Sequence, residues 1–257
     1  MIASLAALLG TTGPKALALI LSATLVAGLV RGFVGFGAGM IFVPIVGSIV
    51  GPMPAVGLIW TVDAPVTMAF AAGAMKGSHW RDIGPLLVGA LSGLPLGMWL
   101  LTGLDPVAVR WATAIFILAS VAALASGWRY KAKPGLLLTF LVGFCSGVTT
   151  GLVGIGGPFI ALFWLGGFND AVQLKRNLNA YFGATTLTMG PAFVLKGIIT
   201  VDVLILAVPL LALYLIGVAA GLGGFRHSSD TVYRRAALVM SALAAIMSLP
   251  ALDAWLR

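Results

Sequence analysis

The sequence predicts an all-α polytopic membrane protein made of two inverted five-segment repeats, whose glycine-rich helices are broken or re-entrant and meet near the membrane midplane. Three observations support this fold class. The 257 residues are 60% hydrophobic and only 9% charged, whereas a soluble domain has roughly 25% charged residues. The apolar runs are long and unbroken, and two motifs recur in the same order in both halves of the chain.

Composition also excludes other classes of protein. An outer-membrane barrel alternates apolar and polar residues, which these continuous apolar runs do not. The net charge of +8 is spread over short loops, and this favours charges that orient a membrane protein over nucleic-acid binding. Cys145 is the only cysteine, so no intramolecular disulfide can form. The first ten residues contain no basic residue, so we expect no cleaved signal peptide.

Ten apolar segments are predicted to be helices. In order along the chain they cover residues 15–31, 36–50, 54–75, 83–103, 107–126, 134–151, 156–168, 177–195, 201–223 and 233–252. The second and seventh segments are short for a hydrocarbon core of ~30 Å, and each follows a cluster of glycines. We therefore expect each of these two segments to be half of a broken or re-entrant helix.

The charges of the loops predict how the chain is oriented in the membrane. If successive connections alternate sides, one face collects eleven of the fifteen lysines and arginines and the other face collects four. The positive-inside rule then places the first face in the cytoplasm. Both termini are consequently expected outside the inner membrane, in the periplasm.

The chain repeats itself once. VGFGAGMIFVP at 34–44 resembles VGIGGPFIALF at 153–163, and MKGSHWRD at 75–82 resembles LKGIITVD at 195–202. The two pairs keep the same order and nearly the same offset, which indicates a duplication. Because each half holds five segments, the halves should insert with opposite topology, a recurring construction of secondary transporters. We predict one integral transmembrane domain, with a first repeat at 1–128 and a second at 129–257.

The glycine clusters predict two sharp turns and, between them, an anion site. Such glycines let the backbone leave the helix, and in a membrane the freed amides find partners only inside protein or at a wet cavity. A helix that starts after the turn points its positive dipole end into the gap. The residues expected at this site are Gly35, Phe36, Gly37, Gly154, Gly156 and Gly157. The alternative is small-xxx-small helix packing, as in the pairs Gly28/Gly32 and Gly35/Gly39.

Polar residues next to the clusters add to the predicted anion site. Arg31 lies beside the first cluster, and the matching position in the second half is Thr150, preceded by Thr149. A cation and two hydroxyls near two helix N-termini suit a small oxyanion. The alternative for Arg31 is that it caps the first segment at the cytoplasmic interface and snorkels toward water.

Two further polar residues fall inside predicted segments. Asp63 lies near the centre of the third segment, where an ionisable residue is a functional hypothesis by default. It either accepts a proton and couples transport to the proton gradient, or pairs permanently with Arg31. In the eighth segment Asn179 forms a stripe with Gly183 and Thr186, and we expect this stripe to face the cavity.

The chain offers no recognisable catalytic or metal-binding constellation. It contains no glutamate, and His79 has no second His, Cys or Glu near it in the sequence. No Ser-His-Asp or paired-carboxylate arrangement can be assembled at one depth. We therefore expect no enzyme activity, cofactor or metal, and we expect Lys175 and Arg176 to be charges at the membrane interface.

The doubled glycine motif, GFGAGMIFVP and GLVGIGGPFIALFW, resembles the signature of the sulfite exporter TauE/SafE family of membrane proteins. Ala-Val pairs at 55–56 and 171–172 and the Gly-x4-Asp loops recur where that family has similar elements. The resemblance covers nearly the whole chain. It implies an anion transporter whose members are linked to export of sulfite and organosulfonates, or to uptake of related sulfur compounds. Together with the repeats and with Asp63, it leads us to expect a secondary transporter that exports such an anion by alternating access coupled to the proton motive force. The alternatives are an anion channel and a carrier of a non-sulfur organic anion such as a carboxylate.

The chain departs from the family pattern after the Ala-Val pairs. That pattern usually continues Ala-Val-x-Thr, but Leu58 and Leu174 stand where the threonine would be. We therefore expect a cavity suited to a larger or partly apolar organic anion, with an apolar wall that includes Trp60, Phe33 and Phe36. The expected partners are the anion, the lipid bilayer and a proton as coupling ion, and not nucleic acid; the resemblance implies no particular oligomeric state.

Overall fold

The part of the chain that the structure describes is built from helices. The structure is a computed structural model, and it describes residues 13–126, 135–167 and 171–226. Its elements are α2 (Pro14–Val34), α3 (Ala38–Val50), α4 (Pro52–Ala74), the short 3-10 helix η1 (Met75–Gly77), α5 (Trp80–Gly103), α6 (Pro106–Ala125), α7 (Leu136–Val153), α8 (Gly157–Gly167), α9 (Ala171–Leu195) and α10 (Val201–Arg226). The α-helices correspond to the first nine predicted segments, and the tenth, 233–252, lies outside the described residues.

Five helices are long and apolar enough to cross a membrane, namely α2, α4 continued by η1, α5, α7 and α10. By contrast, α3 and α8 have 13 and 11 residues, about 20 and 17 Å at 1.5 Å per residue, which is too short to cross a ~30 Å core alone. Large apolar side chains such as Val88, Trp99 and Leu136 are exposed on the outside of the helices. An apolar exterior of this kind fits a lipid surrounding, and the protein is a multi-pass membrane protein.

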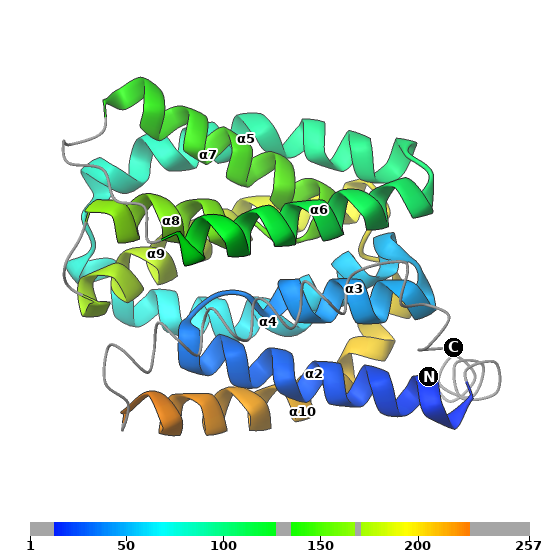
Figure 1. Cartoon of the computed structure of the whole chain (residues 1–257). Coiled ribbons are helices and arrows are strands. Elements are labelled where there is room, and N and C mark those ends of the chain that lie inside the picture. Colours follow the sequence, from blue (N-terminus) through cyan, green and yellow to red (C-terminus); the bar gives the residue numbers. More distant parts are fainter. Residues whose placement is uncertain (1–12, 127–134, 168–170, 227–257) are drawn as a thin grey trace.

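The helices α2 and α10 form one outer layer of the molecule (Figure 1). Their backbones touch, because a Cβ on Gly28 would overlap the carbonyl oxygen of Tyr214 and a Cβ on Gly32 would overlap that of Val218. The contacts advance in the same direction along both helices, so the two run parallel. This is small-xxx-small packing, and the packing interpretation is therefore correct for Gly28 and Gly32.

The helices α5 and α7 form the opposite outer layer in the same way (Figure 1). A Cβ on Gly89, Gly93 or Gly97 of α5 would overlap a carbonyl oxygen of α7, and Gly143 and Gly147 of α7 abut α5 equally closely. Here too the contacts advance together, so α5 and α7 are parallel.

The inner helices lie between these two outer layers, with α3 beside α2, α4 beside α10, α8 beside α7 and α9 beside α5 (Figure 1). At the centre, α4 and α9 pack antiparallel, because Gly183 abuts Ala71 whereas Gly190, later in α9, abuts Trp60, earlier in α4. Asp63 lies eleven residues from either end of α4. Its side chain therefore sits near the middle of a spanning helix, and the candidate site is built around it.

Candidate functional site

The first glycine cluster interrupts the chain between two helices. α2 ends at Val34 and α3 begins at Ala38, and the two intervening glycines have left-handed backbones, with φ of +88° at Gly35 and +91° at Gly37. Residues with a side chain rarely adopt this conformation because Cβ meets the following carbonyl oxygen. Glycine is thus required at both positions, and here it breaks the helix rather than packing it.

The second glycine cluster makes a matching interruption. α7 ends at Val153, Gly154 is left-handed with φ of +70°, and α8 begins at Gly157. Gly156 is required for a different reason, since a Cβ there would overlap the hydroxyl oxygen of Thr150 and lie 2.7 Å from that of Ser146.

The two interruptions touch each other. A Cβ on Gly39, in the first turn of α3, would lie 2.9 Å from the carbonyl oxygen of Gly154, and a Cβ on Gly157 would lie 3.2 Å from Cβ of Phe36. The N-terminal ends of α3 and α8 therefore lie side by side. Each end carries backbone N–H groups without intrahelical partners and the positive end of a helix dipole.

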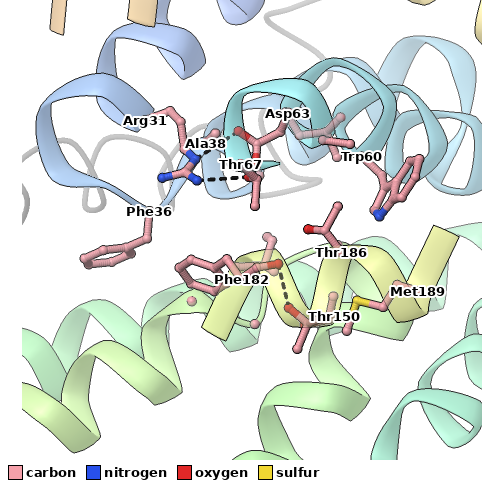
Figure 2. Close-up of a pocket in the computed structure, with 18 of the residues that line it drawn as sticks. Arg31, Phe36, Ala38, Trp60, Asp63, Thr67, Thr150, Phe182, Thr186 and Met189 are labelled. Carbon is pink, nitrogen blue, oxygen red and sulfur yellow. Dashed lines mark hydrogen bonds and ion pairs between the residues drawn. The ribbon is translucent and has the colours of Figure 1, made fainter. Parts of the chain in front are cut away.

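A cavity of about 110 Å³ opens where these ends meet α4 and α9. Water takes ~30 Å³ in the liquid, so the cavity has room for a small anion. Ten of the fifteen residues that the sequence predicts at the cavity line it, namely Arg31, Phe36, Gly37, Trp60, Asp63, Thr150, Gly154, Gly156, Gly157 and Thr186. Figure 2 shows Arg31 of α2 and Asp63 and Trp60 of α4 on one side of the cavity, and Thr150 of α7 with Phe182, Thr186 and Met189 of α9 on the other.

Arg31 is buried, with 2% of its surface exposed, and does not snorkel to an interface. Its Nε donates to Oδ1 of Asp63 at 2.9 Å, and its Nη2 donates to the hydroxyl of Thr67 at 2.9 Å. Its Nη1 donates to the carbonyl oxygen of Gly35, at the break. A guanidinium has five N–H donors, so these three bonds leave two donors for other acceptors.

Two aromatic rings complete the surroundings of the guanidinium. Cζ of Arg31 lies 5.3 Å from the ring centroid of Phe70 and 5.9 Å from that of Phe182. Both distances allow cation–π attraction. The two rings therefore stabilise the charge in a place where little water reaches it.

Asp63 accepts hydrogen bonds from three elements of the chain. Besides Arg31 of α2, its Oδ1 accepts from the hydroxyl of Tyr214 of α10 at 2.7 Å, and its Oδ2 accepts from Thr67 of α4 itself at 2.7 Å. Its side chain is 26% exposed, because one side faces the cavity. The ion pair with Arg31, one of the two alternatives for Asp63, is thus present in this structure.

The second break is held by neutral hydroxyls. Ser146 donates to the carbonyl oxygen of Gly156 at 2.9 Å, and the hydroxyl of Tyr181 donates to Oγ of Ser146 at 3.1 Å. Thr150 lines the cavity while donating to the carbonyl oxygen of Ser146 at 2.7 Å. These bonds fix the backbone of the break without bringing a charge to it.

Five predicted site residues do not line the cavity, namely Phe33, Gly35, Thr149, Asn179 and Gly183. Phe33 packs against Gly224 of α10, and Gly183 packs against Ala71 of α4. Gly35 contributes only its carbonyl oxygen, to Arg31. The hydroxyl of Thr149 donates to the carbonyl oxygens of Cys145 and Ser146 in its own helix. Successive residues of a helix point in different directions, so Thr149 points away from the cavity that Thr150 faces. Asn179 is buried two helical turns before Thr186 and does not reach the cavity.

Several residues of the site were not singled out as ligands in the sequence. Thr67 follows Asp63 by four residues, and this helical spacing is a usable signal. Tyr214 is 151 residues from Asp63 and carried no local signal. Lys175, expected at the membrane interface, is half-buried and donates to the carbonyl oxygen of Gly32 at 3.3 Å. Within the described residues, no three His, Cys, Asp or Glu side chains are grouped to hold a metal ion.

Comparison with known proteins agrees with this construction. The family model described as "Sulfite exporter TauE/SafE" matches residues 20–248, which include all but the first six residues of α2 and every later helix that the structure describes. No curated protein and no solved structure gives a significant match. The family match covers most of the chain, and the protein therefore belongs to the sulfite exporter TauE/SafE family of membrane transport proteins.

Proposed function

We propose that this protein is a secondary transporter that exports a small anion, sulfite or an organosulfonate, across the bacterial inner membrane. The observation that carries the proposal is the cavity between the two helix breaks, beside a buried arginine and at mid-length of α4. Helix N-termini that meet in a membrane-embedded cavity are a recurring way to bind anionic substrate groups. The family supplies the class of substrate.

An inverted-repeat mechanism is supported by the way the helices pair. In the sequence repeat α2 matches α7, and α5 matches α10. The helix contacts have the same symmetry, because exchanging the two repeats turns the pair α2 and α10 into the pair α7 and α5. In both pairs the helices are parallel and pack through glycines. We infer that the two halves insert with opposite topology, with both termini in the periplasm, and that they rock about the cavity to give alternating access.

Proton coupling follows from the competition for Arg31. In this structure the carboxylate of Asp63 forms an ion pair with the guanidinium of Arg31. The other groups that face this carboxylate are Thr67 of α4 and Tyr214 of α10. Protonation of Asp63 weakens its hold on Arg31, and a buried cation without a partner is unfavourable. A bound anion would replace the lost charge, so proton and anion binding favour each other, and by linkage the effect is reciprocal. The proton then moves with the anion, so export runs down an outward gradient of the anion, whereas the inward proton motive force alone would drive uptake.

The test is transport by the purified protein in liposomes, with solid-supported-membrane currents for a panel of sulfite, sulfonates and carboxylates. We expect saturable transport that increases when the side holding the anion is acidified. Currents report it for the sulfite dianion, and a pH-sensitive dye in the liposomes reports it for monovalent anions, whose one-to-one movement with a proton carries no net charge. Asp63→Asn should retain anion binding and lose this pH dependence. Unsaturable, pH-independent flux would indicate a channel, and currents with carboxylates alone would indicate a carboxylate carrier.

A matched pair of glycine variants checks that the cavity is the site. Gly156→Ala places a methyl group against Thr150 and Ser146, whereas Gly73→Ala in α4 meets no atom within 4 Å. We expect Gly156→Ala to abolish the currents and Gly73→Ala to leave them unchanged. Absence of a response to every anion in the unsubstituted protein would contradict the proposed function.

A further inference from the structure

One polar atom in the wall of the cavity is not explained by the protein's own hydrogen bonds. The indole Nε1 of Trp60 is buried and has no hydrogen-bond partner among the described residues, although Trp60 lines the cavity. Indole nitrogen is a donor only, and buried donors in folded proteins are nearly always paired. An unpaired donor beside a binding cavity therefore calls for an acceptor that the described residues do not supply.

The indole ring packs against two residues of α9. Gly190 of α9 leaves the slot into which the ring fits, since a Cβ there would lie 2.7 Å from Cζ2 of Trp60. Phe193 meets the same ring edge-on, with ring centroids 6.2 Å apart and planes inclined by 71°. The ring therefore has little freedom to turn its N–H toward another acceptor.

Trp60 lies on the same face of α4 as Asp63 and Thr67, at helical spacings of three and seven residues. Arg31 contacts Asp63 and Thr67, while Trp60 lies about one helical turn before Asp63. Figure 2 shows Arg31 and Trp60 on either side of Asp63, with the indole nitrogen on the side of the ring that faces Thr186 and Met189 of α9. The cavity thus has a charged end at Arg31 and a neutral donor at Trp60.

We infer that Trp60 is a specificity-determining residue that donates its indole N–H to an oxygen of the bound anion. The inference rests on the proposed function and extends it. An anion held at both ends must present two separated acceptor atoms, one toward Arg31 and one toward Trp60. The site therefore selects oxoanions, whose oxygens are spread over a pyramidal or tetrahedral group, over a monatomic halide of the same charge.

The test compares Trp60→Phe, which keeps an aromatic ring and removes the N–H, with Trp99→Phe. Trp99 is 63% exposed on the outside of α5, so its replacement is a matched control. A hydrogen bond to a charged group accounts for about 10- to 100-fold in affinity. We expect Trp60→Phe to raise KM for sulfite and a sulfonate by this factor with little change in kcat, to leave weak bromide binding unchanged, and Trp99→Phe to change neither.

Three outcomes would overturn the inference. If Trp60→Phe still transports and its affinity for oxoanions is unchanged, the indole N–H does not bind the anion, and the proposed function is unaffected. An equal loss for bromide and sulfite assigns Trp60 to packing alone. Absence of oxoanion binding by the unsubstituted protein overturns the inference and the proposed function together.

A measurement on the unsubstituted protein guards against a variant that fails to fold. The chain has seven tryptophans, whose indole N–H groups give separate ¹⁵N-indole resonances. Saturating sulfite should shift one of them downfield, as a new hydrogen bond does, and bromide should not. A titration in which sulfite binds and no indole resonance moves would contradict the inference.

Discussion

The two helix breaks have the same backbone plan and opposite chemistry. At the first, Gly35 and Gly37 turn the chain, and the break is fixed by an arginine that is itself held by Asp63. At the second, Gly154 turns the chain, and Ser146 fixes the break through the carbonyl oxygen of Gly156. Thr150 stands at the position that matches Arg31. The first break, with Arg31 and Asp63, is the charged break. The second, bound only by hydroxyl groups, is the neutral break.

The breaks also differ in the helices on which they depend. The charged network joins α2, α4 and α10 through Arg31, Asp63 and Tyr214. The neutral network joins only α7 and α9, through Ser146 and Tyr181. If the halves move against each other, the charged network can respond to protonation, because it contains the carboxylate. The neutral network has no group that changes charge near neutral pH, so we expect it to act as the fixed wall.

The largest effect on stability should come from breaking the charged network. Asp63→Ala leaves Arg31 buried without its carboxylate, and loss of one partner of a buried pair costs roughly 3–5 kcal/mol. We expect the loss in the free energy of unfolding to lie at the lower end of that range, because the Asp63 side chain is 26% exposed and water screens its charge. Thermal unfolding in detergent measures the loss, with the exposed Asp202→Ala as control. Equal melting temperatures for the two variants would show that the ion pair does not hold the first break.

The next effect should come from filling the neutral break. In Gly156→Ala the new methyl group overlaps Thr150 and approaches Ser146, and overpacking of this kind costs about 1–3 kcal/mol. Combining it with Thr150→Ala removes one of the two obstacles and should restore part of the stability in the same unfolding measurement. A double variant no more stable than Gly156→Ala would place the strain elsewhere.

A pair of tyrosines compares the networks directly. Tyr214→Phe removes a hydrogen bond to a carboxylate, about 1.5–3 kcal/mol, whereas Tyr181→Phe removes one between hydroxyls, about 0.5–1.5 kcal/mol. Both side chains are almost fully buried, so their surroundings are matched. Tyr214→Phe should also change the pH dependence of transport, and Tyr181→Phe should not. Equal unfolding temperatures and equal pH profiles would mean that the charge of Asp63 is not what distinguishes the two breaks.

The sequence predicted the helices and both interruptions because these depend on local composition and on glycine. The nine segments seen here start and end within a few residues of their predictions, except that α9 begins earlier, through Lys175 and Arg176. The partner of Arg31 was left open, since a sequence does not say which of two mid-membrane groups meet. Tyr214 was missed because its contact with Asp63 joins α10 to α4 and has no local pattern.

The smallest expected effect separates two neighbouring hydroxyls that the sequence treated alike. Thr149→Val removes bonds only to carbonyl oxygens of its own helix, outside the cavity, and should change stability by no more than about 0.5 kcal/mol and transport not at all. Thr150→Val keeps the shape of the cavity wall and removes the hydroxyl that faces Gly156. If that hydroxyl also contacts the anion, KM should rise by roughly 2- to 10-fold, measured by the same currents. An equal rise in KM for Thr149→Val and Thr150→Val would mean that the direction in which each side chain leaves α7 does not decide which threonine contacts the anion. The neutral side of the cavity would then not be formed by Thr150 as described above.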